Sequence, residues 1–141
     1  MADVGTQAQY VDAVKFKLTN ITDSQTFIQL QNVRFGLIHG MEKKARTDGN
    51  IDKFYNSSDN FIEADIMLTR PQIATLVTLA TITSGNLPTK TWELNMVDIA
   101  GTTTTLQASA QLAQFYAIRP VVGLSMFHIR LECSSITVTV T

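Results

Sequence analysis

The side chains that could do acid–base, metal or thiol chemistry lie far apart in this sequence. His39 and His128 share no metal-ligand spacing, and we do not expect either to be catalytic. Cys133 falls on the apolar side of an alternating segment, which favours a small buried hydrophobe over a reactive thiol. Glu63 and Asp65 share one face, as glycosidase carboxylates would, but alternate polar positions on a strand give the same pattern. The sequence therefore predicts no enzyme, no bound metal and no cofactor.

Two further features could bind ligands, and each has a plainer interpretation. The basic run at residues 43–46 could contact phosphate, but Glu42, Asp48 and Asp52 dilute its charge, so a solvated or ion-paired segment is favoured. Trp92 begins an alternating strand and is expected in the core instead of on a ligand platform. The seven glycines are scattered and form no phosphate-binding loop.

Composition limits the class of protein. The 141 residues are 45% hydrophobic and 16% charged, with a net charge of −1 and one cysteine. This length suits one domain, 1–141, with a core of its own. The charge gives no basic footprint for nucleic-acid binding, and one cysteine excludes an internal disulfide. We expect a soluble protein made in a cytoplasm, because no signal peptide is visible and the most apolar stretch, 73–82, is too short and Thr-rich to insert into a membrane.

Alternation of apolar and polar residues is the clearest structural signal. Apolar side chains occupy every second position from Phe127 to Cys133, and again from Ile136 to Val140. A period of two is typical of a half-buried β-strand. Further such runs lie at 10–19, 27–38, 61–68, 91–97 and 105–118. We expect a mainly β protein, an antiparallel sandwich or small barrel of six to eight strands, with a bulge near residues 31–32 where the apolar parity changes.

One segment has helical periodicity. Thr69 and Gln72 fit a capping box and Pro71 fits the first turn. An apolar stripe at positions i, i+3, i+4 and i+7 follows, at Ile73, Leu76, Val77 and Ala80. We predict one short flanking helix over residues 71–84 that packs this stripe on the sheet.

Residues 39–60 lack regular periodicity and carry many charges. They read as a long loop after the second strand, and such loops are usually functional or disordered. Their apolar side chains would be out of place in a free linker, so we predict an inter-subunit contact. The expected interface residues are Met41, Glu42, Lys43, Lys44, Arg46, Ile51, Phe54 and Tyr55. Residues 1–9 have no pattern and are expected to form a flexible arm.

The order of these elements resembles that of a known family. A loop at 40–60, a helix at 71–84, a hairpin at 92–112 and closing strands at 124–140 are similar to the tail tube proteins of bacteriophages. Contractile injection systems and type VI secretion have related tubes. The resemblance implies hexameric rings that stack into a DNA-conducting tube of a virion, with sheath, baseplate and terminator proteins as further partners. It also implies an acidic lumen, for which Glu63, Asp65 and Glu93 are the candidates, although the net charge is modest.

Physical reasoning independently favours assembly. A strand-rich chain with few charges must protect its sheet edges, and pairing them between copies of a homo-oligomer does so. Two other classes of function stay open. One is a different virion component, such as a head-decoration, neck or tail-terminator protein. The other is a monomeric carbohydrate-binding module that uses Tyr55, Trp92 and Tyr116 as stacking platforms.

Overall fold

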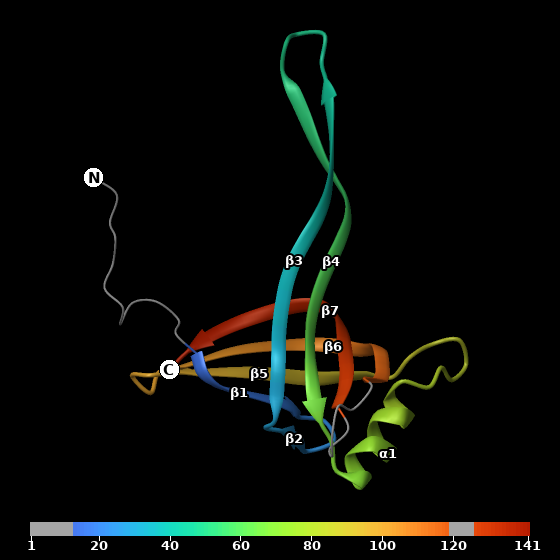
Figure 1. Ribbon diagram of the computed structural model, residues 1–141. Coiled ribbons are helices and arrows are strands. Elements are labelled where there is room, and N and C mark those ends of the chain that lie inside the picture. Colours follow the sequence, from blue (N-terminus) through green and yellow to red (C-terminus); the bar gives the residue numbers. More distant parts are fainter. Residues whose placement is uncertain (1–12, 119–125) are drawn as a thin grey trace.

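The computed structural model describes residues 13–118 and 126–141 of the chain. These residues contain seven strands and one helix (Figure 1). The mainly β class with one short helix is therefore confirmed. The arm predicted at residues 1–9 lies outside the described residues. The elements in chain order are β1 (Ala13–Asn20), β2 (Gln25–Phe27), β3 (Leu30–Ala45), β4 (Ile51–Met67), α1 (Arg70–Leu79), β5 (Thr89–Asp98), β6 (Thr103–Ile118) and β7 (Met126–Val140).

All seven strands belong to one antiparallel sheet, which rolls up on itself. Its strand order is β2-β1-β5-β6-β7-β4-β3, so β2 and β3 are the two edges. Only Ile28 and Gln29 separate these edges in the chain. Two residues between strand ends allow a reach of at most about 11 Å. The sheet must therefore curl until its ends approach, and β3 and β4 cross the other strands in Figure 1.

The core lies inside this roll. Trp92 is 1% exposed and stacks on Phe27 with ring centroids 6.2 Å apart. This confirms Trp92 as a core residue. Cys133 packs against the core as predicted, and burial raises the pKa of its thiol to about 11. The other large core side chains come from five strands and the helix: Leu18, Ile62, Ile66, Leu76, Leu94, Leu112, Ile129 and Leu131.

Helix α1 begins where the sequence predicts and ends earlier. The Gln72 side chain accepts a hydrogen bond of 3.0 Å from the Thr69 backbone N–H, which completes the predicted cap. The helix stops at Leu79 instead of residue 84. Threonine hydroxyls in this segment bond to carbonyls four residues back, which weakens a helix. In the shorter helix the buried residues are Leu76 and Leu79, and Val77, predicted in the apolar stripe, is half exposed.

The predicted loop at 39–60 is instead the outer part of a long hairpin. β3 and β4 pair from Leu30 opposite Ile66 to Ala45 opposite Ile51, and this ribbon projects far from the body (Figure 1). Its tip is a tight turn in which Gly49 has a φ of 88°. These strands could not be recognised in the sequence because most of their side chains are exposed on both faces. Apolar and polar residues therefore do not alternate along them. A register shift at Gly40 and Met41 interrupts the pattern further.

Candidate functional site: a charged ladder at the root of the hairpin

Five charged or polar side chains meet where the hairpin joins the body. Glu63 on β4 lies opposite Arg34 on β3 and Arg130 on β7, and Asp65 on β4 lies opposite His128 on β7. Their neighbours along β4, such as Ile62 and Ile66, face the core, so the charged side chains share the opposite face. We call Arg34, Glu63, Asp65, His128 and Arg130 the root ladder.

Glu63 is the centre of the root ladder. Glu63 is only 7% exposed, and two guanidinium groups and one imidazole surround its carboxylate. Arg34 Nη2 lies 3.0 Å from Oε1, while His128 Nε2 and Arg130 Nη1 lie 3.3 Å and 3.6 Å from Oε2. Removing a carboxylate from water costs several kcal/mol unless charges and hydrogen bonds replace the lost hydration. These three partners replace part of the hydration that the Glu63 side chain loses in this position.

His128 lies between two carboxylates. Its Nδ1 is 2.8 Å from Asp65 Oδ1, and its Nε2 faces Glu63. The ring therefore lies between two acceptors, one on each side, and the neighbouring Tyr116 covers it with its own ring at a centroid distance of 4.9 Å.

Asp65 is held in its charged form. Burial alone would raise its pKa, but hydrogen bonds from Asn32 and His128 and the charges of His128 and Arg34 outweigh burial, so the pKa lies below the ordinary value of 3.8. Asn32 donates to Asp65 Oδ2 at 2.7 Å. Asn32 has a φ of 51° and sits in a register shift between Gln31 and Arg34. The bulge predicted at residues 31–32 is thus confirmed, and it aims Asn32 at the ladder.

Arg130 ties β7 to the departing hairpin. Its Nε donates to Glu132 at 2.7 Å, and its Nη2 donates to both oxygens of Asp59 at 2.9 Å and 3.0 Å. The bond to Glu132, then the bond to Asp59, raise the pKa of Arg130 against the effect of burial. The guanidinium lies 4.3 Å from the centre of the Phe61 ring. Gly36 leaves room for that ring, because a Cβ there would come within 2.9 Å of it.

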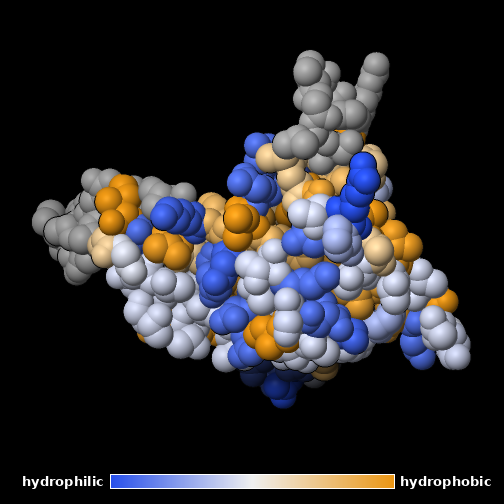
Figure 2. All heavy atoms as spheres, turned by 90° about the horizontal axis from the view of Figure 1, so that it is seen from below, coloured by the Kyte–Doolittle hydropathy of each residue, from blue (hydrophilic) through white to orange (hydrophobic). Residues whose placement is uncertain are grey.

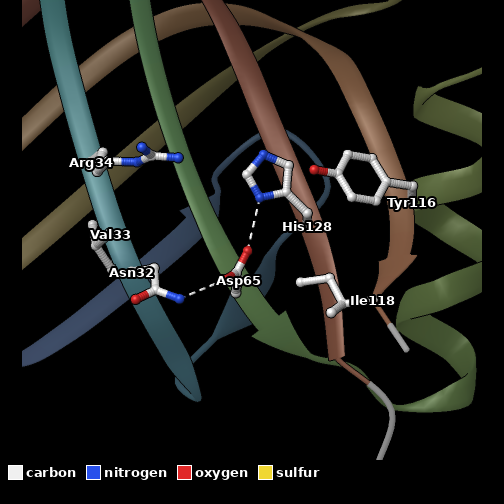
Figure 3. A pocket seen from close by; sticks show the side chains of 7 residues that line it. All are labelled: Asn32, Val33, Arg34, Asp65, Tyr116, Ile118 and His128. Atoms are coloured by element: carbon white, nitrogen blue, oxygen red, sulfur yellow. Dashed lines mark hydrogen bonds and ion pairs between the residues drawn. The ribbon is translucent and has the colours of Figure 1, made fainter. Parts of the chain in front are cut away.

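A cavity of about 650 Å³ opens beside the root ladder (Figure 3). Val33 and Ile118 give it apolar walls, and Asp65 and His128 form its polar side. Arg34 on β3 and Tyr116 on β6 also line it. We call this space the root cavity.

The predicted interface residues all lie on the outer hairpin, away from the root ladder. Met41, Ile51, Phe54 and Tyr55 are each about half exposed or more. Among the predicted charged residues, Arg46 pairs with Asp48 and Asp52 on the same hairpin, and Lys43 lies directly opposite Lys53. Like charges placed opposite one another destabilise a hairpin in isolation. The outer hairpin therefore carries both apolar and basic surface that lacks a cover among the described residues.

The three predicted lumen carboxylates do not lie together. Glu93 lies on β5 between two core residues, Trp92 and Leu94, and so points to the opposite face of the sheet. Its cross-strand neighbours are Thr19 and Gln107. Glu63 and Asp65 lie on a different strand, inside the root ladder. The sequence did not predict their cationic partners, although His128 and Arg130 occupy alternate polar positions on a strand.

Each ladder carboxylate already accepts bonds from cationic or amide groups, and no set of three or more His, Cys, Asp or Glu side chains in residues 13–118 and 126–141 is placed to hold a metal. Within the same ranges, no helix has the length and apolar character needed to cross a membrane. Figure 2 shows hydrophilic and hydrophobic residues intermixed over the underside.

Comparison with known proteins shows which solved structures have this architecture. No protein-family model and no curated protein sequence matches the chain. Solved structures do match over nearly its full length. A chain of the tube-terminating cap of the anti-feeding prophage is 14% identical with a TM-score of 0.67, covering 99% of this chain and 97% of that one. This chain shares its fold with a component of that tube-terminating cap.

Two further solved structures share the fold of this chain. A chain from the sheath-tube complex of an extracellular contractile injection system, in its extended state, is 13% identical with a TM-score of 0.67, covering 97% of this chain and 99% of that one. A chain from the tail of an empty gene transfer agent particle, treated with C6 symmetry, is 10% identical with a TM-score of 0.56, covering 89% and 95%. The predicted resemblance is confirmed, and identities this low establish the fold alone.

Proposed function

We propose that this protein is a structural subunit of a phage tail or related injection particle, and that it forms the tube by stacking rings. The observation that carries the proposal concerns the four neighbouring strands β1, β5, β6 and β7. Part of each outer strand of this group, β1 and β7, is a free sheet edge. β2 pairs with β1 only at residues 18–20. Residues 13–17 of β1 therefore have no second neighbouring strand among the described residues. β4 covers β7 only at residues 126–132, which leaves 133–140 similarly open.

These free edges are complementary. Strands β1, β5, β6 and β7 alternate in direction, so the open edge of β7 would meet the open edge of β1 in a second copy as an antiparallel pair. A repeated contact of this head-to-tail kind closes into a ring when its rotation permits. Ring closure would give partners to backbone groups that otherwise invite aggregation. Four strands from every copy would then form one continuous barrel, and we propose six copies because a structural relative was treated with C6 symmetry.

One face of the four-stranded part suits a water-filled channel. Opposite its core residues lie polar side chains, which include Lys17, Glu93, Asn95, Gln107 and Thr137. A polar, threonine-rich lining would let DNA pass without tight binding, and Glu93 would add repulsion of phosphate. Glu63 and Asp65 remain lumen candidates, but their cationic partners leave them little net charge for repulsion.

The outer hairpin suits a contact between subunits. A two-stranded ribbon is at best marginally stable alone in water, and this ribbon exposes apolar side chains on both faces. We propose that Met41, Ile51, Phe54 and Tyr55 are covered by neighbouring subunits. Sheath and baseplate proteins are proposed as further partners of the finished tube.

A tail-terminator role is the second candidate, because one structural relative is a tube-terminating cap. The two roles differ in assembly, since a tube subunit stacks indefinitely and a terminator stops at one ring. A carbohydrate-binding module is disfavoured, because one of its three proposed platforms, Trp92, is buried in the core.

Two proline substitutions on β7 test the ring. Thr141 exchanges hydrogen bonds with Thr103 on β6, so by strand alternation the N–H of Thr139 also points to β6 and that of Val138 points to the free edge. Val138→Pro should abolish rings in negative-stain images and leave a folded monomer. Thr139→Pro, the matched control, should destabilise the monomer itself. Normal ring formation by Val138→Pro would contradict the proposed edge pairing.

A further inference from the structure

The root cavity and the hairpin tip lie at opposite ends of the same two strands. Arg34 lines the cavity near the start of β3, and the tip follows Ala45 at its end. Eleven residue steps at about 3.3 Å each separate Arg34 from Ala45 by roughly 36 Å. Figure 1 shows the tip far from the body in which the cavity lies. A second copy displaced along the hairpin by about this length would bring its own root cavity to the first copy's tip.

The chemistry of the root cavity favours an anionic group with an apolar neighbour. Arg34 uses one nitrogen to bind Glu63, and its side chain is 67% exposed, which leaves other N–H donors facing outward. Arg34 is the guanidinium of the lining, and the single lining carboxylate, Asp65, already accepts bonds from Asn32 and has His128 Nδ1 at 2.8 Å. Val33 and Ile118 supply apolar wall beside these donors.

The hairpin tip offers the complementary chemistry. Asp48 is about half exposed and already accepts bonds from Arg46 at 3.0 Å, from the Asn50 backbone N–H at 3.1 Å and from the Asn50 side-chain amide at 3.2 Å. A carboxylate has about four lone-pair positions, so Asp48 can accept a further donor. Ile51, also exposed, lies three residues away. The bonds that hold the turn, including 2.8 Å from Arg46 N–H to the Asn50 carbonyl, reduce the entropy lost on docking.

We propose that the root cavity is the receptor for the hairpin tip of a second copy in the adjacent ring, with Asp48 bound by Arg34 and Ile51 packed against Val33 and Ile118. This inference rests on the proposed function, since it requires copies that form rings. The contact is directional, because each copy gives a tip on one side and a cavity on the other, and it can repeat without end.

Disulfide trapping between two differently labelled copies tests this contact. Both copies carry Cys133→Ser, so that no native thiol remains. One copy then carries Asp48→Cys, and the other carries Tyr116→Cys in the cavity or, as the matched control, Val77→Cys on α1; Tyr116 and Val77 are similarly exposed, at 53% and 50%. After mixing and mild oxidation, we expect at least about tenfold more mixed dimer with the cavity thiol than with the helix thiol, because a disulfide needs Cα atoms within about 7 Å.

A second cavity variant, Ile118→Cys, guards against damage from losing the Tyr116 ring beside His128. Trapping by either cavity thiol supports the inference. If rings stack but neither cavity thiol gives more mixed dimer than the helix control, the inference is overturned and the proposed function stays intact. A dominant dimer joined through position 48 of both copies would have the same consequence. Failure of the unsubstituted protein to form rings would instead overturn the proposed function, and the inference with it.

Discussion

The replacement Glu63→Gln tests whether the root ladder stabilises the fold through charge. The change keeps the size of the side chain and removes one buried negative charge, leaving His128, Arg34 and Arg130 each with one partner fewer. The contact to His128 is buried on both sides, and a buried polar contact to a charged group contributes about 1.5–3 kcal/mol. The contact to the exposed Arg34 adds only about 0.5 kcal/mol. Arg130 keeps Asp59 and Glu132, so its loss is small.

We therefore expect Glu63→Gln to lower the free energy of unfolding by about 2–3 kcal/mol. Urea titration followed by the fluorescence of Trp92, the one tryptophan, would measure this change. The measurement is best made in the Val138→Pro background, because assembly makes apparent stability depend on concentration. Glu93→Gln is the matched control, on the polar face of β5, and should cost below about 0.5 kcal/mol. A loss for Glu63→Gln no larger than that of the control would refute the reasoning.

Three further predictions concern the helix, the ladder and the hairpin. Leu76→Ala should cost roughly 2–5 kcal/mol in urea unfolding because Leu76 is fully buried, whereas Val77→Ala should cost under about 1 kcal/mol; equal costs would contradict the orientation of α1. The lowered pKa of Asp65 contributes stability that is fully present above pH 3.8 and is lost as pH falls through the lower pKa of the folded state. Asp65→Asn should therefore flatten the acid side of a curve of unfolding free energy against pH. An unchanged curve would be evidence against this coupling. Replacing residues 43–53 by a two-residue Asn-Gly turn, which joins the cross-strand partners Glu42 and Phe54, should prevent assembly and keep the β-rich circular dichroism spectrum. Normal tubes from this variant would show that the outer hairpin is not part of the interface.

The fold class could be predicted because its main signals are local. Alternation in segments such as 127–133 depends only on which side of a strand faces the core. The change of parity at residues 31–32 similarly marked a real bulge, and the capping box at Thr69 and Gln72 marked a real helix start. Each of these signals depends on a few neighbouring residues.

The hairpin and the root ladder could not be predicted, for two different physical reasons. Strands exposed on both faces carry no alternation, so residues 39–60 resembled a charged loop. The ladder depends on the register between β4 and β7, which joins Glu63 to Arg130 across the sheet. Alternation shows which face a residue takes and gives no information about its partner on a distant strand. The helix end at Leu79 was missed because threonine hydroxyls compete with the helical backbone.

The central claim is that rings close by pairing β7 of one copy with β1 of the next, and a cryo-electron microscopy structure of the assembled protein would measure this pairing directly. We expect residues 133–140 of one copy to run antiparallel to residues 13–17 of its neighbour, with the strands about 4.8 Å apart as in any β-sheet. The polar face bearing Glu93 should line the channel. Rings in which these two edges stay more than about 7 Å apart, or a protein that remains monomeric at high concentration, would contradict the account.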